Sequence, residues 1–129
     1  MKLTRVWWGL GVLLVLIVVV VCILPSNEIP GVFELNDKVS HLLGHGALAI
    51  YFAGLIPRPR WWKIFVFLLL LGSAIEVAQY AMHWGRQGDP RDVIANSMGA
   101  ALGLLIARLG LARWPEFAAW VLFRGRPAQ

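Results

Sequence analysis

The charge-free stretch over residues 6–24, VWWGLGVLLVLIVVVVCIL, constrains the fold of this chain more than any other feature. At a rise of about 1.5 Å per residue, a helix of this length crosses a hydrocarbon core of roughly 30 Å. The preceding MKLTR resembles the start of a signal peptide, but the apolar stretch is longer than the usual 7–15 residues or so and no A-x-A site follows. We therefore expect a retained membrane-spanning helix.

Composition excludes an ordinary soluble domain. Hydrophobic residues make up 59% of the chain and charged residues only 15%, against roughly 25% charged residues in a typical soluble domain. The net charge of +5 comes from basic residues that lie between apolar runs, so it indicates membrane topology and not nucleic-acid binding. The single cysteine, Cys22, lies in the first apolar run and excludes an intramolecular disulfide framework.

Apolar runs and polar breaks predict an all-α, multi-pass membrane protein that forms one domain over residues 1–129. Four transmembrane helices are expected at about residues 6–24, 37–56, 62–84 and 92–112. The second opens with the polar sequence DKVSHLLGHG, which indicates that its first half faces protein and not lipid. Aromatic residues recur at helical spacing in the C-terminal tail, which predicts a short interfacial helix there.

The distribution of the 12 Lys and Arg residues predicts the orientation. Cytoplasmic loops carry the excess of basic residues in membrane proteins. In the four-helix arrangement one side collects Lys2, Arg5, Arg58, Arg60, Lys63, Arg108, Arg113, Arg124 and Arg126. The other side holds only Lys38, Arg86 and Arg91. Both termini are therefore predicted to be cytoplasmic.

Polar residues within the expected spans form three stripes at the level of the outer leaflet. Residues four apart on a helix share a face, as do Asp37, His41 and His45, with Lys38 beside them. The full set of predicted ligand-binding residues is Asp37, Lys38, His41, His45, Glu76, Gln79, Arg86, Asp92 and Asn96. Glu76 is the most informative, because an acid inside a span costs roughly 2.5–3.5 kcal/mol unless it is compensated. A polar pocket is expected; the alternative is a structural ion pair between Glu76 and Lys38 or Arg86.

Glycines predict where helices approach closely. Gly99 and Gly103 form a G-x-x-x-G pair on the fourth span, and Gly72 lies four residues before Glu76 on the third. The heads of the second and fourth spans also share a pattern, with Asp37, His41 and Gly44 matching Asp92, Asn96 and Gly99. Such an echo is expected when two helix pairs are related by an axis along the membrane normal.

These residues resemble the motifs of the VanZ-like family: D-K-x-x-H from Asp37, E-x-x-Q from Glu76, and R-x5-D-x3-N-x2-G-x3-G from Arg86. The resemblance covers about residues 34–107 and implies a small bacterial inner-membrane protein of about four helices. The family's name-giving member is associated with low-level resistance to the glycopeptide teicoplanin. His45 departs from the pattern, because relatives often have an aromatic residue at this position.

Three functions remain open from the sequence. The first is recognition of an anionic membrane lipid or lipid-linked envelope precursor, with Lys38 and Arg86 as the cations. The second is an intramembrane enzyme acting on such a lipid, with His41 as general base and Asp37 or Asp92 orienting it. The third is a structural or accessory subunit. No cofactor is expected; the candidates for an alternative metal site are His41, His45 and Glu76, which Asp37 or Asp92 could complete.

Overall fold

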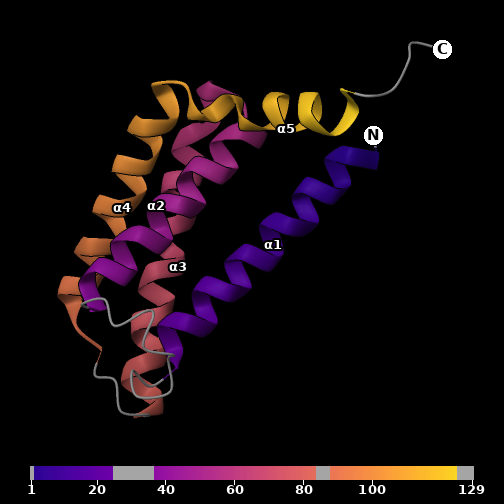
Figure 1. Cartoon of the computed structure of the whole chain (residues 1–129). Coiled ribbons are helices and arrows are strands. Elements are labelled where there is room, and N and C mark those ends of the chain that lie inside the picture. The colour runs from indigo at the N-terminus through magenta and orange to yellow at the C-terminus, as the bar shows by residue number, and fades with distance from the viewer. Residues whose placement is uncertain (1, 25–36, 84–87, 125–129) are drawn as a thin grey trace.

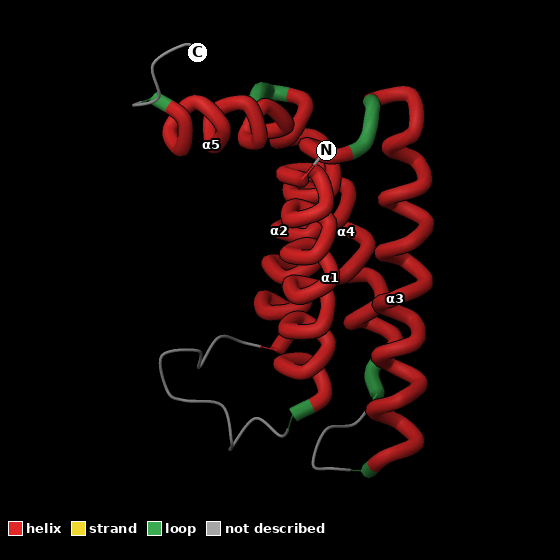
Figure 2. Tube along the Cα trace, turned by 90° about the vertical axis from the view of Figure 1, so that its right-hand side faces the viewer, coloured by secondary structure: helices red, strands yellow, loops and turns green. Residues whose placement is uncertain are grey.

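The computed structural model describes residues 2–24, 37–83 and 88–124. In these residues every regular element is a helix, as predicted (Figures 1 and 2). The elements in chain order are α1 (Lys2–Ile23), α2 (Asp37–Leu55), the 3-10 turn η3 (Arg58–Arg60), α3 (Trp61–Met82), α4 (Pro90–Arg108), the 3-10 turn η4 (Leu111–Arg113) and α5 (Trp114–Phe123).

Local backbone conformations explain where the observed helices depart from the expected bounds. Helix α3 ends at Met82 because His83 takes a left-handed conformation with φ of 49°. Asp89 caps α4 by accepting a hydrogen bond from the backbone N–H of Arg91, and Pro90 occupies the first turn, where its missing N–H costs nothing. Helix α4 ends at Arg108, earlier than the expected residue 112, and Gly110 turns the chain with φ of 138°.

The helices alternate in direction, so that α2 and α4 run parallel to each other while α1 and α3 run the opposite way (Figure 1). Glycines bring the backbones of α2 and α4 together: a Cβ on Gly99 would meet the carbonyl oxygen of Leu42, and one on Gly103 would meet that of Gly46. Gly72 serves α3 in the same way, since a Cβ there would lie 2.6 Å from Asn96 Nδ2 of α4. This seam fixes the register of the two parallel helices.

Within the described residues, two segments are long and apolar enough to cross a membrane, Leu3–Ile23 and Arg58–Met82. A third candidate joins Pro90–Arg108 to Leu111–Phe123 across a bend of 75°. Helix α2 does not meet this test by itself, because its first half is polar. The chain is therefore a helical protein with two or three candidate membrane spans, and a fourth crossing by α2 stays a prediction.

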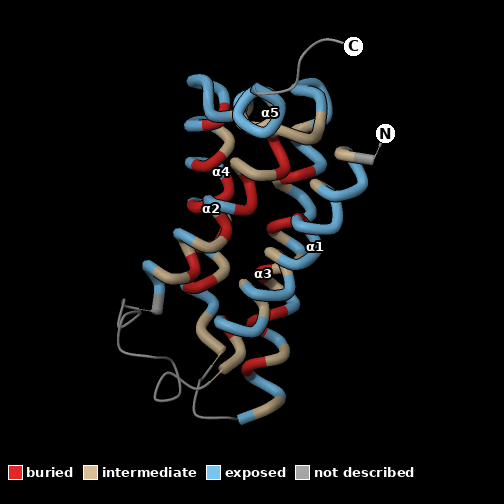
Figure 3. Tube along the Cα trace, turned by 45° about the vertical axis from the view of Figure 1, so that its right-hand side comes forward, coloured by how far each residue is buried: buried red, intermediate tan, exposed pale blue. Residues whose placement is uncertain are grey.

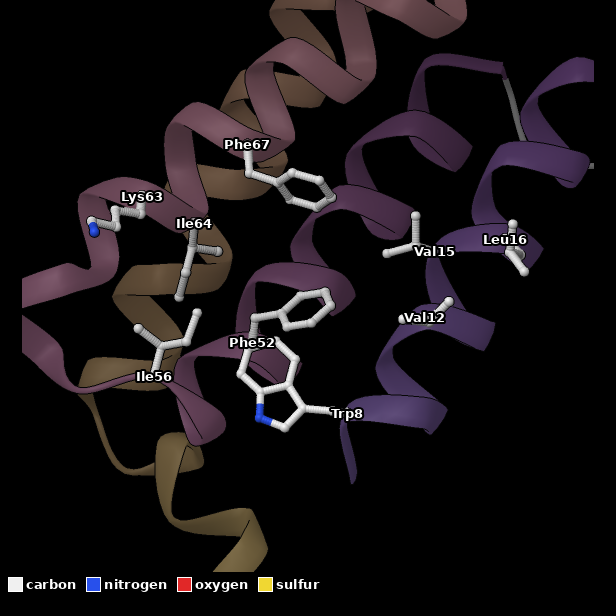
Figure 4. A pocket seen from close by; sticks show the side chains of 9 residues that line it. All are labelled: Trp8, Val12, Val15, Leu16, Phe52, Ile56, Lys63, Ile64 and Phe67. Atoms are coloured by element: carbon white, nitrogen blue, oxygen red, sulfur yellow. The ribbon is translucent and has the colours of Figure 1, made fainter. Parts of the chain in front are cut away.

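Helix α5 lies across the end of the bundle at which α1 begins (Figures 1 and 2). Buried residues line the facing sides of α2, α3 and α4, while α1 stays largely exposed (Figure 3). Between α1 and the pair α2 and α3 lies an apolar groove of about 320 Å³, whose walls include Trp8, Phe52 and Phe67 (Figure 4). Helix α1 therefore packs against the bundle more loosely than the other spans.

Candidate functional site

Buried polar side chains gather near the end of the bundle at which α2 and α4 begin. We call this set the polar cluster: His41, His45, Glu76, Gln79, Asp92 and Asn96, each at most 7% exposed. All six were predicted from the sequence to share one level of the fold. Of the other predicted residues, Lys38 is exposed beside the cluster, the side chain of Asp37 lies outside what the structure describes, and so does Arg86.

His41 lies at the centre of the polar cluster. Its Nδ1 is 3.0 Å from Asn96 Oδ1 on α4, and because an amide oxygen only accepts, this imidazole nitrogen carries the proton. Its Nε2 lies 3.8 Å from Glu76 Oε1 and 4.0 Å from Asp92 Oδ2. One imidazole thus links a side chain from α3 to two from α4.

Lys38 and Asp89 form a rim around the cluster. The Lys38 ammonium lies 3.0 Å from Asp89 Oδ2 and 3.2 Å from Asp92 Oδ1. The backbone N–H of Asp89 donates to Glu76 Oε2 at 2.9 Å. The N–H of Arg91, and next the Lys38 ammonium, hold the pKa of Asp89 below its ordinary value. Asp89 was not among the residues predicted from the sequence, although its position directly before a helix-starting proline is a capping signal.

Three side chains of the polar cluster retain buried atoms that make no hydrogen bond to any part of the chain the structure describes. His45 Nδ1 donates to the carbonyl of His41 at 3.1 Å, and Gln79 Nε2 donates to the carbonyl of Cys22 at 2.5 Å. The atoms left over are His45 Nε2, Gln79 Oε1 and Asn96 Nδ2. A buried polar atom without a partner costs about 1–3 kcal/mol, so these three atoms are the ones from which further hydrogen bonds are expected.

Cys22 is a second residue that sequence analysis left out of the site. Its thiol is buried and lies 3.9 Å from His41 Nδ1, while its carbonyl accepts from Gln79. Only its place near the end of the first apolar run could have indicated this contact. The end of α1 therefore closes one side of the polar cluster.

The residue pattern shared by the first turns of α2 and α4 corresponds to a contact between these two parallel helices. When Asp37 is matched with Asp92, His41 matches Asn96, and these two side chains are hydrogen-bonded to each other. Equivalent positions of two parallel helices meet in this way when an axis along the bundle relates them.

A groove of about 450 Å³ runs along the first turns of α2 and α4. Its wall is apolar apart from two basic residues, Lys38 and Arg91, which stand at the second positions of the two helices. The apolar residues are Val39, Leu42, Ile94, Ala95 and Met98. From the sequence, Arg91 was interpreted only as a topology signal, and it was not among the predicted site residues.

Long apolar helices and a buried polar cluster at one end of their bundle together define a helical membrane protein. The VanZ/LLP1 family model matches residues 10–112, and the chain belongs to this family, which confirms the resemblance drawn from its motifs. The matched range contains α2, α3, α4, the whole polar cluster and both basic residues of the groove. No curated protein and no solved structure matches the chain significantly.

Proposed function

We propose that this VanZ-family protein recognises an anionic lipid, or a lipid-linked precursor of the cell envelope, at the outer face of the bacterial inner membrane. One observation carries the proposal: the apolar groove between α2 and α4 has Lys38 and Arg91 at the same end. In this proposal both termini lie in the cytoplasm, because most of the basic residues belong to the opposite end of the bundle. Such recognition would connect the protein with glycopeptide resistance.

The groove fits an amphiphile in size and composition. Its volume of about 450 Å³ falls within the roughly 300–1,000 Å³ of small-molecule sites. Met98 lies two turns along α4 from the basic end, so an acyl or polyprenyl chain would extend along the helices, away from Lys38 and Arg91. Methionine adapts its shape to varied apolar partners, which suits a hydrocarbon chain.

Arg91 is the better cation for the headgroup. Lys38 already faces Asp89 and Asp92, whereas the guanidinium of Arg91 forms no ion pair with the residues that the structure describes. A guanidinium also offers two parallel N–H groups to a phosphate, which an ammonium does not. We therefore assign the principal phosphate contact to Arg91 and a supporting one to Lys38.

Native mass spectrometry of the detergent-purified chain with phosphatidylglycerol tests this assignment. Arg91→Gln should weaken phosphatidylglycerol binding at least about tenfold, because a hydrogen bond to a charged group contributes about 1.5–3 kcal/mol. The matched control is Arg108→Gln at the far end of the same helix, which should bind phosphatidylglycerol like wild type. Diacylglycerol, which lacks the phosphate, should bind wild type and Arg91→Gln equally.

A steric variant tests the groove itself. Met98→Trp should reduce binding by filling the groove, whereas Leu102→Trp, one turn further along α4 and outside the groove lining, should not. Equal lipid binding by Arg91→Gln and wild type, or equal losses in Arg91→Gln and Arg108→Gln, would remove the basis for this function.

A further inference from the structure

We propose that His41, Glu76 and Asp92 form a binding site for one first-row divalent cation, with Zn²⁺ as the best match. The three residues come from α2, α3 and α4, and one ligand atom from each lies within 4.8 Å of the other two. All three are buried. The inference rests on this geometry and not on the lipid groove. None of the three candidate ligands lines that groove, although Lys38, which contacts Asp92, does.

Each candidate ligand is held by a separate group through its other polar atom. Asn96 accepts from His41 Nδ1, Lys38 donates to Asp92 Oδ1, and the N–H of Asp89 donates to Glu76 Oε2. The remaining atoms, His41 Nε2, Asp92 Oδ2 and Glu76 Oε1, are the ones that converge, with separations of 3.8 and 4.0 Å from the imidazole. Metal-binding histidines and carboxylates are oriented by outer hydrogen bonds of this kind.

The orientation of the His41 ring fits a ligand role. Its Nδ1 is engaged by Asn96, and its Nε2 is the ring nitrogen that faces the carboxylate oxygens of Glu76 and Asp92. Lys38 contacts Asp92 at Oδ1, on the outer side of the site, while Asp92 Oδ2 lies on the side of His41.

The donor set favours zinc. One imidazole nitrogen and two carboxylate oxygens suit Zn²⁺, whereas Ca²⁺ takes six to eight oxygens at about 2.3–2.6 Å. Zinc holds its N and O ligands at about 2.0–2.2 Å, so tetrahedral ligand atoms lie roughly 3.4 Å apart. The observed separations of 3.8 and 4.0 Å would close by about half an ångström on binding. Three protein ligands leave a fourth position open, as in catalytic zinc sites.

His45 is not among the candidate ligands, although it was a candidate from the sequence. It lies one turn beyond His41, and its Nδ1 is engaged by the carbonyl of His41. The site takes Asp92 in its place. His45 therefore provides a matched control: it is a buried histidine on the same helix that should not affect metal binding.

The test uses the full chain purified in detergent, stripped with a chelator and titrated with Zn²⁺ alone. We expect one zinc ion per chain by elemental analysis and calorimetry, and a higher melting temperature with zinc, because a ligand that binds only the folded state stabilises it. Asp92→Asn and Glu76→Gln should each weaken zinc binding at least tenfold. His45→Gln and Arg91→Gln should keep full zinc binding, and the latter should still lose lipid.

Wild-type protein with no more bound zinc than Asp92→Asn would overturn the proposal and leave the three residues as a buried polar network without a metal. An equal loss in His45→Gln would overturn it as well. Should the variants fail to fold, the wild type decides, since an unchanged melting temperature with and without Zn²⁺ excludes the site. A failure of lipid binding with intact zinc binding would contradict only the proposed function.

Discussion

The two ends of the bundle bury polar atoms in opposite ways. At the end at which α2 finishes, which we call the aromatic end, polar aromatic side chains donate to backbone carbonyls; the donors are Tyr51, Trp61 and Trp114. The Tyr51 hydroxyl donates to the carbonyl of Trp7 at 2.6 Å, and Trp114 Nε1 donates to the carbonyl of Tyr51 at 3.1 Å. The rings of Tyr51 and Trp114 also stack, with centroids 4.7 Å apart. This end holds α1, α2 and α5 together.

The polar cluster, at the opposite end, is less completely satisfied. His45 Nε2, Gln79 Oε1 and Asn96 Nδ2 are buried without hydrogen bonds among the described residues, and two carboxylates lie within 4.8 Å of the same imidazole. Replacing buried ion pairs by apolar packing is often neutral or stabilising, so the polar cluster is weak evidence for stability. We therefore propose that one end stabilises the bundle and that the other end binds a ligand.

The largest loss of stability is expected at the glycine seam, the close contact between α2 and α4 that lies between the two ends. Gly99→Ala places a Cβ against the backbone carbonyl of Leu42, which has no flexible end to move aside. We expect α2 and α4 to separate and the free energy of unfolding to fall by about 3 kcal/mol. Thermal unfolding in detergent measures this. Gly9→Ala is the control, because its Cβ would meet nothing within 4 Å, and a wild-type melting temperature for Gly99→Ala would show that the seam is not tight.

A smaller effect separates the roles of the two ends. Tyr51→Phe removes the hydrogen bond to Trp7 and should lower the free energy of unfolding by about 1 kcal/mol. Zinc and phosphatidylglycerol binding should stay unchanged, because the groove and the polar cluster lie near the other end. Tyr80→Phe is the control, since Tyr80 is 71% exposed and should change neither stability nor binding. A loss of zinc binding in Tyr51→Phe would contradict the division of roles.

The smallest effect concerns pH at the rim of the polar cluster. The pKa of Asp89 is lowered in the folded state by the N–H of Arg91 and by the Lys38 ammonium. Folding thus favours the charged form of the Asp89 carboxyl group. Its contribution to the stability of the fold is complete above the ordinary Asp pKa of about 3.9 and is lost as the pH falls through the lowered pKa. The melting temperature of wild type should therefore fall more steeply below about pH 4 than that of Asp89→Asn.

The control for this pH profile lies beyond the opposite end of the bundle. Glu116 on α5 pairs with Arg113 of the 3-10 turn η4, and their side chains are 69% and 81% exposed, respectively. An ion pair this exposed contributes little to stability, so Glu116→Gln should follow the wild-type profile. Identical profiles for Asp89→Asn and wild type would mean that the Lys38 and Asp89 contact does not stabilise the fold.

Much of the fold follows from the order of apolar and polar segments. The run over residues 6–24 predicts α1, and the tail aromatics predict the separate helix α5. The early end of α4 was missed, since the apolar pattern continues past Arg108 while Gly110 turns the backbone. The fourth membrane crossing is not established, because the polar face of α2 that serves the cluster also lowers its hydropathy.

The sequence by itself determined the helices, the glycine seam and the six residues of the polar cluster, because these depend on spacing along single helices. Only the tertiary structure decided which polar atoms meet. The hydrogen bond between His41 and Asn96 depends on the register of α2 against α4. The approach of His41 to Glu76 and Asp92 depends in addition on the position of α3 along the bundle. The tertiary structure also decided the roles of Asp89, Arg91 and Cys22. Each of them acts together with a residue on another helix or in the α3–α4 connection. Spacing within one helix carries no information about such a partner.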